Sequence, residues 1–382
     1  MGFFRRAWAE IHLDRLGENA KSFKNQLKGE TELLCVVKAD CYGHGSPDCA
    51  LYLQKELNVK WFAVSNLNEA IELREGGIDG EILILGYTPP EFAEYLSRYN
   101  IIQAITETNY AQLLSQNAKS PVRCHIKLDT GMTRIGLRCE NVNEYKAEIE
   151  KICGLENIKA EGIFTHLCVA DSKSDDDILY TNKQISLFNE IYSQIKDSCP
   201  QIVHHHYLNS AGGICHDEGK STLARLGIIL YGLKPDYELD IPFEINPAME
   251  LKAVVSQVKT VEAGAEISYG RTFKADRETK LATVSIGYAD GVPRALSNKG
   301  ELLVNGKRAK IVGRVCMDQL MIDVTGIDVK AGDVATVFGN DGDERITADD
   351  IAKICNTIGY EIVCNITKRV PRLYYVNEKD YV

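Results

Sequence analysis

The feature that most restricts the fold is an alternation of two apolar patterns over roughly the first 230 residues. Between most of the strand-like runs lie stretches whose apolar residues recur with helical spacing, such as DCALYLQKEL and NKQISLFNEIYSQIKDSC. Eight short aliphatic and β-branched runs are typical of buried strands, at 33–40, 61–66, 81–86, 101–106, 122–130, 159–166, 204–210 and 222–228. Eight alternations predict an α/β fold, a TIM-like (β/α)8 barrel.

A different pattern follows the Pro-containing segment 234–249, where strand-like runs follow one another without long helices between them. Asn305-Gly306 separates two alternating runs and has the residue types of a tight hairpin turn. The sequence therefore predicts a barrel over 1–240 and a mainly β C-terminal domain over 241–382. The first N-terminal residues are expected to pack with the second domain, and the polar stretch 171–177 is expected to be a solvated loop.

Composition narrows the partners of this chain of 382 residues. A net charge of −10 argues against a surface that holds nucleic acid, and no apolar stretch is long enough to suggest a membrane span. Twelve scattered cysteines and an N-terminus without an apolar signal run suggest reduced thiols in the cytoplasm. We predict no metal site, because the cysteines form no CxxC pair and the neighbours in His204–His206 would point to opposite faces of a strand.

Polar residues end several of the predicted barrel strands, where a core would favour Val, Ile or Leu. They include Lys38, Lys127, His166, the pair Asn209-Ser210, and Arg225. Active sites of such barrels lie where the strands end at their C-terminal face. A buried lysine there loses its charge readily, and the neutral amine condenses with aldehydes. On this evidence alone, a lysine that extends its charge to solvent is the favoured interpretation of Lys38.

The segment VVKADCYGHG resembles the alanine racemases, whose pattern is a lysine, three residues, and then Tyr-Gly-His-Gly. Further motifs follow in the family's order, so the resemblance runs from AWAEIHLDRL to KRVPR and covers nearly the whole chain. It implies a pyridoxal-phosphate-dependent racemase that interconverts L- and D-alanine and supplies D-alanine for peptidoglycan. Such an enzyme works as a homodimer with active sites shared across the interface.

The resemblance also implies residue roles within the barrel. Lys38 would form the internal Schiff base with the cofactor and serve as one of two acid/base groups. Arg225 would face the pyridine nitrogen without giving up its proton. The further cofactor-binding residues implied are Tyr42, His166, Asn209, Ser210, Gly227 and Ile228, of which the two last contribute backbone amides to phosphate binding.

The second acid/base group implied by the resemblance is Tyr269, which the partner subunit contributes and which His166 neighbours. A phenol of ordinary pKa near 10 is a poor base at neutral pH, so neighbours must stabilise its deprotonated form. Without the resemblance, Tyr269 would be interpreted as a core or interface aromatic. The loop Cys316-Met317-Asp318 and Tyr288 would reach into the neighbour's site, with the Met317 amide on the substrate carboxylate.

Arg134 matches the arginine near the substrate carboxylate, and Lys127 matches a lysine that is carbamylated in many members of the family. One departure from the family pattern leaves the choice between alanine and serine as substrate undecided. Lys368 stands where many members have a tyrosine that bounds the substrate pocket. The alternatives are therefore a serine or mixed racemase, a basic amino-acid decarboxylase, and a non-catalytic pyridoxal-phosphate-binding protein. The decarboxylase motifs are not evident, and the non-catalytic proteins resemble the barrel half alone.

Overall fold

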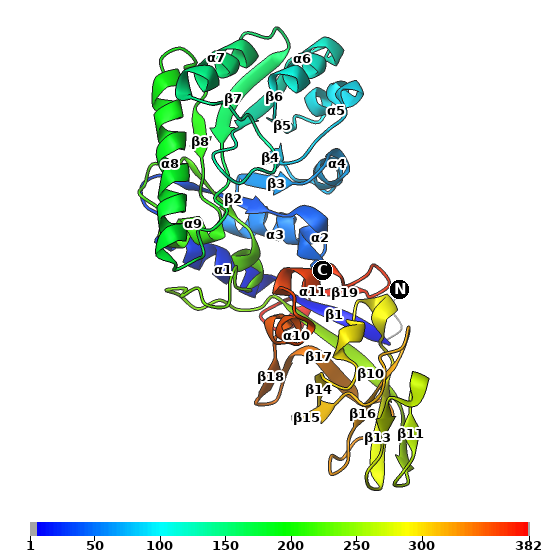
Figure 1. Ribbon diagram of the computed structural model, residues 1–382. Coiled ribbons are helices and arrows are strands. Elements are labelled where there is room, and N and C mark those ends of the chain that lie inside the picture. The colour runs from blue at the N-terminus through cyan, green and yellow to red at the C-terminus, as the bar shows by residue number, and fades with distance from the viewer. Residues whose placement is uncertain (1–5, 381–382) are drawn as a thin grey trace.

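The computed structural model describes residues 6–380, and Figure 1 shows a barrel joined to a second, mainly β unit. The parallel barrel strands are β2 (Glu32–Val36), β3 (Trp61–Val64), β4 (Glu81–Ile84), β5 (Ile102–Ile105), β6 (Val122–Lys127), β7 (Ile158–Phe164), β8 (His204–His206) and β9 (Leu223–Leu226). They follow chain order from β2 to β8, and β9 pairs with β2. A bridge between Leu208 and Ala224 nearly closes the ring, which confirms the predicted barrel.

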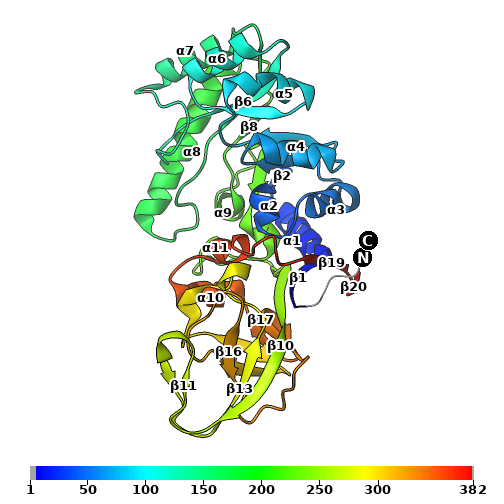
Figure 2. The same cartoon turned by 90° about the vertical axis from the view of Figure 1, so that its right-hand side faces the viewer.

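Helices cover the outside of this barrel (Figures 1 and 2). Phe23, Leu53 and Phe188 are fully buried helical residues, while Phe62 and Ile126 fill strands. The helices are α1 (Leu13–Gln26), α3 (Asp48–Leu57), α4 (Leu67–Glu75), α5 (Ala93–Arg98), α6 (Thr108–Asn117), α7 (Val142–Cys153), α8 (Asp175–Ile195) and α9 (Ser210–Cys215). The helical spacing of apolar residues in the sequence therefore corresponds to helix faces that are buried against the barrel.

Two local predictions need correction. The predicted strands run one to four residues too far at their C-terminal ends, because the chain leaves the sheet at or before the polar residues that follow most of the strands. The stretch 171–177 is a loop only in its first part: Ser174 caps α8 by accepting a hydrogen bond from the Asp177 amide, and Asp175–Asp177 form the first helical turn. Acidic residues are favoured in that turn by the helix dipole.

The second unit is built on a sheet of order β15-β14-β17-β10-β1-β19-β20. Its strands are β1 (Ala7–His12), β10 (Met249–Val261), β11 (Glu266–Ile267), β12 (Phe273–Lys274), β13 (Thr279–Val284), β14 (Glu301–Val304), β15 (Lys307–Lys310), β16 (Leu320–Asp323), β17 (Val334–Asp341), β18 (Glu344–Ile346), β19 (Arg372–Val376) and β20 (Lys379–Asp380), and its helices are α10 (Ala348–Cys355) and α11 (Gly359–Cys364). Asn305 and Gly306 both have positive φ and join β14 to β15, as predicted. The N-terminal strand β1 lies in this sheet, between β10 and β19, whereas the boundary at residue 240 stays a prediction.

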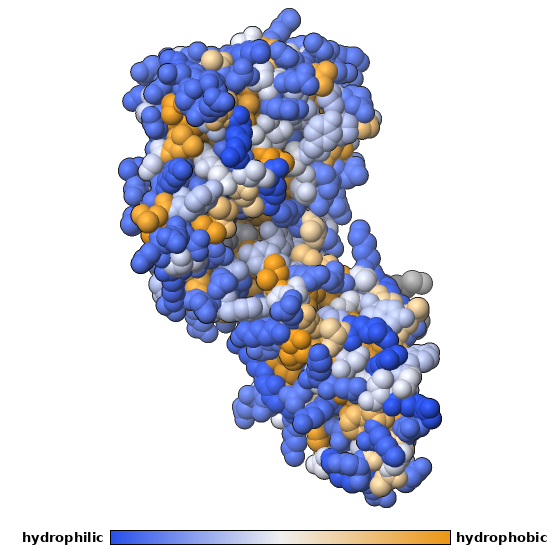
Figure 3. All heavy atoms as spheres, viewed as in Figure 1, coloured by the Kyte–Doolittle hydropathy of each residue, from blue (hydrophilic) through white to orange (hydrophobic). Residues whose placement is uncertain are grey.

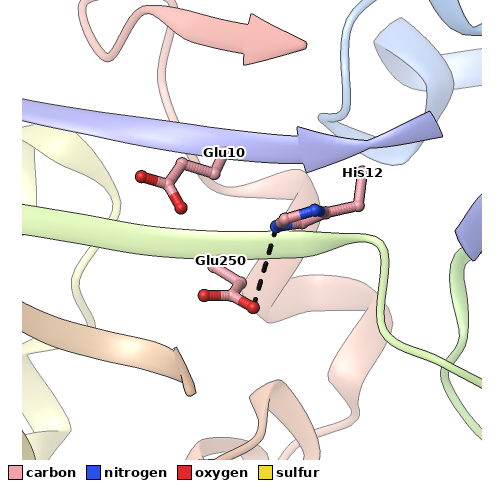
Figure 4. A group of neighbouring side chains, drawn as sticks. All are labelled: Glu10, His12 and Glu250. Atoms are coloured by element: carbon pink, nitrogen blue, oxygen red, sulfur yellow. Dashed lines mark ion pairs between the residues drawn. The ribbon is translucent and has the colours of Figure 1, made fainter. Parts of the chain in front are cut away.

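An ionic cluster joins β1 to β10 (Figure 4), and Arg15 of α1 adds to it where the two units meet. Potential metal-ligand atoms of Glu10, His12 and Glu250 lie within 4.8 Å of one another. However, Glu10 pairs with Lys252 at 2.6 Å and Glu250 pairs with Arg15 at 2.9 Å. Both carboxylates are thus already neutralised by cations, and we assign the cluster to the junction of the two units.

Polar residues cover most of the face shown in Figure 3, with hydrophobic residues interspersed among them. Within residues 6–380, no helix combines the length and the apolar character that crossing a membrane requires.

Candidate functional site

A cavity of about 500 Å³ lies at the C-terminal mouth of the barrel, where the strand ends converge. It is bounded by residues that end or directly follow β2, β3, β4, β6, β7 and β9. All site residues that were predicted within the barrel line this cavity: Lys38, Tyr42, Lys127, Arg134, His166, Asn209, Ser210, Arg225, Gly227 and Ile228. Tertiary structure thus brings together side chains that are up to 190 residues apart in the sequence.

Lys38 begins an unusual backbone segment, α2 (Lys38–Tyr42). Residues 39–42 all have φ between 52° and 55°, so they form one left-handed turn without a glycine. Such a conformation costs about 1–2 kcal/mol for each residue with a Cβ, and strain of this kind persists only where the surroundings impose it. The turn carries both Lys38 and Tyr42 into the cavity lining.

Side chains hold the far end of this turn. Nδ1 of the fully buried His44 lies 3.0 Å from both the Cys41 and the Tyr42 carbonyl oxygens. Because both partners are acceptors, Nδ1 must carry the proton. Burial lowers the pKa of His44 to about 4, so the imidazole is neutral at physiological pH. Asp40 adds a second bond by accepting from the Ser46 amide at 2.7 Å.

Arg225 is buried at the floor of the cavity with neutral acceptors around it. Its guanidinium donates to the Thr165 carbonyl at 2.7 Å, to the Tyr207 carbonyl at 3.2 Å and to His206 Nδ1 at 2.7 Å. Burial and the neighbouring Arg134 lower the pKa of Arg225 to about 9, which leaves it protonated at neutral pH. The site therefore holds a fixed positive charge that gives up no proton.

The protons of the adjacent histidines follow from this donor. His206 Nδ1 accepts from Arg225, so His206 Nε2 carries the proton and donates to His125 Nδ1 at 3.0 Å. His166 Nδ1 lies 3.4 Å from Arg225 Nη2, which makes this nitrogen an acceptor as well. Burial lowers the pKa of His166 far below its usual value, and the nearby cations lower it further. His166 is therefore neutral, with its proton on Nε2.

Four basic side chains line the cavity: Lys38, Lys127, Arg134 and Arg225. Burial lowers the pKa of Lys38, and Arg134 lowers it further, while Glu69 and Cys364 oppose the shift. Burial lowers the pKa of Lys127 to about 7, with Arg225 adding to the effect. Both lysines are thus more easily deprotonated than lysines in water. An electropositive cavity of this kind suits a ligand with phosphate and carboxylate groups.

The hydroxyls of Ser210 and Tyr42 both face Gly227 in the cavity lining. A Cβ added to this glycine would lie 3.5 Å from both Ser210 Oγ and Tyr42 Oη, so a side chain there would occupy the space that the two hydroxyls face. The Gly227 amide donates to Ser210 Oγ at 2.9 Å. Burial raises the pKa of Tyr42, so its phenol stays a hydrogen-bond donor. Asn209 caps α9 by accepting from the Gly212 amide at 2.8 Å, which fixes Ser210 in place.

The predicted site residues of the second unit lie elsewhere: none of Tyr269, Tyr288, Cys316, Met317 and Asp318 lines the cavity. They gather on one edge of that unit, where the Tyr288 amide donates to the Cys316 carbonyl at 3.0 Å. The exposed fractions of Tyr269, Met317 and Tyr288 are 72%, 53% and 42%. Within residues 6–380, the contact expected between His166 and Tyr269 is not made, and it stays a prediction that requires a second subunit.

Lys368, the residue that left the choice of substrate undecided, is exposed and does not line the cavity. Its neighbour Arg369 instead pairs with Asp318 at 2.8 Å, which ties this segment to the Met317 loop. Tyr360 also lines the cavity, from α11, and was not predicted from the sequence; its ring lies 6.1 Å from that of Tyr42. Tyr42 and Tyr360 are more than 300 positions apart, so no local sequence spacing links them. Only the packing of the two units shows that Tyr360 forms part of the cavity wall.

Comparison with known proteins identifies relatives of both units. The family models described as "Alanine racemase, N-terminal domain" and "Alanine racemase, C-terminal domain" match residues 11–235 and 248–374. The alanine racemase of Clostridium novyi is 41% identical over 381 residues, which covers 98% of this chain and 96% of the relative. The solved alanine racemase of Clostridium difficile 630 superposes with a TM-score of 0.93 at 38% identity and covers 100% of this chain and 98% of its own. The structure of alanine racemase from Bacillus anthracis with bound L-Ala-P has the same TM-score at 35% identity and the same coverage.

Proposed function

The chain belongs to the alanine racemase family, and on this basis we propose that it interconverts L- and D-alanine with pyridoxal phosphate attached to Lys38. The observation that carries the proposal is the convergence of Lys38, Arg225 and the hydroxyls of Tyr42 and Ser210 in one electropositive cavity. An amine, a fixed cation and a hydroxyl cradle fit the aldehyde, the ring nitrogen and the phosphate of this cofactor. We propose that its product, D-alanine, supplies peptidoglycan.

Pyridoxal phosphate, when bound, supplies an electron sink that lets the substrate α carbon lose its proton. Arg225 would face the ring nitrogen and keep it unprotonated, because its guanidinium stays charged and cannot pass a proton on. The Lys38 amine, with its pKa lowered by burial, would take or return the α proton on one face. Arg134 lies in the cavity lining, where its charge would bind the substrate carboxylate.

Racemisation needs a second acid/base group on the opposite face, and we propose Tyr269 of the partner subunit for this role. Its support is the exposed edge that Tyr269 shares with Tyr288 and the Met317 loop. Tyr269 is 72% exposed in the single chain, so it is not a core residue. This exposure fits a side chain that completes another subunit's site. The Met317 amide on the same edge would meet the substrate carboxylate. We therefore propose a homodimer in which each cavity is closed by the other subunit.

Reduction with borohydride tests the assignment of the cofactor. Purified protein loaded with pyridoxal phosphate should retain the cofactor on one peptide, with the label on Lys38, after reduction and digestion. Lys38→Ala should abolish labelling and lower racemase activity by at least about 10³-fold, because it removes the covalent link and one proton carrier together. Label on another lysine in the native protein would overturn the assignment.

A chiral assay over all the common amino acids tests the substrate. Alanine should be the fastest substrate, because Lys368 lies outside the cavity and its exposed side chain does not enlarge it. Serine turnover at an equal or higher kcat/KM would instead support the mixed racemase. Release of CO2 from a basic amino acid would support the decarboxylase, and cofactor binding without any turnover would support the non-catalytic protein.

A further inference from the structure

One carboxylate beside the cavity has no role in the mechanism above. Glu69, on α4, accepts a hydrogen bond from the Ala39 amide on Oε1 at 3.0 Å. Its other oxygen, Oε2, accepts from the Ser65 amide at 2.7 Å. Ala39 directly follows Lys38, and Ser65 directly follows β3 and lines the cavity. A single side chain therefore joins the ends of two neighbouring barrel strands at the cavity.

We propose that Glu69 is a positioning residue for Lys38: it anchors the start of the left-handed turn and places a negative charge beside the lysine amine. The inference rests on the proposed function only in that it takes Lys38 as the reactive lysine. Glu69 has no distinguishing sequence signal, because it lies on a helix whose other acidic residues, Glu72 and Glu75, face solvent.

The anchoring part follows from the backbone. His44 binds the far end of the left-handed turn, Asp40 within the turn accepts from the Ser46 amide, and the Glu69 bond lies at the first residue, Ala39. A hydrogen bond to an ionised carboxylate is roughly twice as strong as one between neutral groups. Because both carboxylate oxygens are used, the turn is also tied to the end of β3. The direction in which Lys38 leaves the barrel wall thus depends on Glu69.

The electrostatic part concerns the groups that act on the Lys38 amine. Burial and Arg134 lower the pKa of Lys38, whereas Glu69 and Cys364 raise it. Among these groups, Glu69 is a carboxylate bonded to the residue next to Lys38. Its removal makes the protonated amine less favourable, so the pKa of Lys38 should fall further. At a given pH, a larger fraction of the lysine is then neutral, and its orientation is lost at the same time.

The test uses the cofactor-free full-length protein and three variants. Glu69→Gln keeps the shape but removes the charge, and its NH2 group cannot accept from one of the two amides. Glu69→Asp keeps the charge but shortens the reach. Glu72→Gln, at an exposed position on the same helix, is the matched control. The readouts are the pH midpoint of Lys38 acetylation, followed by mass spectrometry, and hydrogen exchange at the Ala39 amide.

In Glu69→Gln, the acetylation midpoint of Lys38 should move to lower pH, and Ala39 exchange should accelerate on the order of tenfold. Glu72→Gln should match the native protein in both. A midpoint that is unchanged or higher, or Ala39 exchange at the native rate, would overturn the proposal. Should Glu69→Gln fail to fold, Glu69→Asp decides: faster Ala39 exchange with a native midpoint supports the proposal, and native exchange contradicts it.

These outcomes do not depend on the cofactor. Failure of borohydride to label Lys38 would refute the proposed function and leave the effect of Glu69 on the lysine measurable. Conversely, labelling at Lys38 together with a native Ala39 exchange rate in Glu69→Gln would refute the role of Glu69 alone.

Discussion

Among single residues, Lys127 shows most clearly how the cavity changes side-chain chemistry. It is buried with Arg225 and Arg134 nearby, and its Nζ donates to the Leu128 carbonyl at 2.6 Å. Burial, with the two like charges adding to it, lowers the pKa of Lys127 to about 7. A large fraction of Lys127 is then a neutral amine at physiological pH, the form that adds CO2. A carbamate would turn one cation of this crowded group into an anion that pairs with Arg134.

We therefore expect Lys127 to carry a carbamate in the presence of bicarbonate. With 13C-bicarbonate at pH 8, the native protein should show a carbamate carbon resonance that Lys127→Met lacks. The signal should decrease as the pH falls through about 7, because the protonated amine cannot attack CO2. A spectrum identical to that of Lys127→Met at pH 8 would mean that Lys127 stays unmodified.

At the scale of elements, the left-handed turn 39–42 concentrates strain at the residues that bind the cofactor in our proposal. Neighbouring elements impose it: His44 after the turn, Glu69 on α4, and Arg372 of β19, whose Nε donates to the Gly43 carbonyl at 3.0 Å. Strain of this kind is common where a site needs a fixed geometry.

Ala39 is a suitable position at which to measure that strain. Its φ is 52°, and its side chain is exposed, so a substitution there changes little besides the backbone conformation. Ala39→Gly should raise the free energy of unfolding by about 1 kcal/mol, since glycine adopts the left-handed conformation without the steric cost. The matched control is Ala147→Gly at an exposed position in right-handed α7, which should lower it by about 1 kcal/mol. Urea denaturation of both variants measures the two changes in the free energy of unfolding. If both substitutions lower this free energy, the left-handed turn is not strained at Ala39.

At the scale of the whole molecule, one chain holds two half-sites that do not meet. The cavity lies at the barrel mouth, while Tyr269, Tyr288 and Met317 are exposed on an edge of the second unit. In the homodimer that we propose, a twofold axis brings the edge of each subunit to the cavity of the other.

Mixing inactive subunits tests this arrangement. Lys38→Ala and Tyr269→Ala homodimers should each be inactive, but a heterodimer has one intact site. After dissociation and equal mixing, half of the dimers are mixed, so activity should recover to about a quarter of the native value. Mixtures as inactive as the two parents would contradict shared sites.

The sequence alone predicted the barrel, the β-rich second unit, the hairpin at Asn305-Gly306 and ten of the barrel residues that line the cavity. These features depend on periodicity, turn chemistry and ordered motifs, which are local properties of the chain. It placed the strand ends too late and missed the start of α8, because boundaries depend on competition between the sheet and polar side chains. The role of Tyr269 stays a prediction, since it depends on a second subunit.

Only tertiary structure decided which side chains act on Lys38. The left-handed turn, the bond from Ala39 to Glu69, the chain from Arg225 through His206 to His125, and the Tyr360 wall join residues without any fixed spacing. A lysine at a strand end is ambiguous by itself, because its pKa and direction depend on burial and on charges that arrive from other elements. Those contacts exist only once the barrel has closed and the second unit has packed against it.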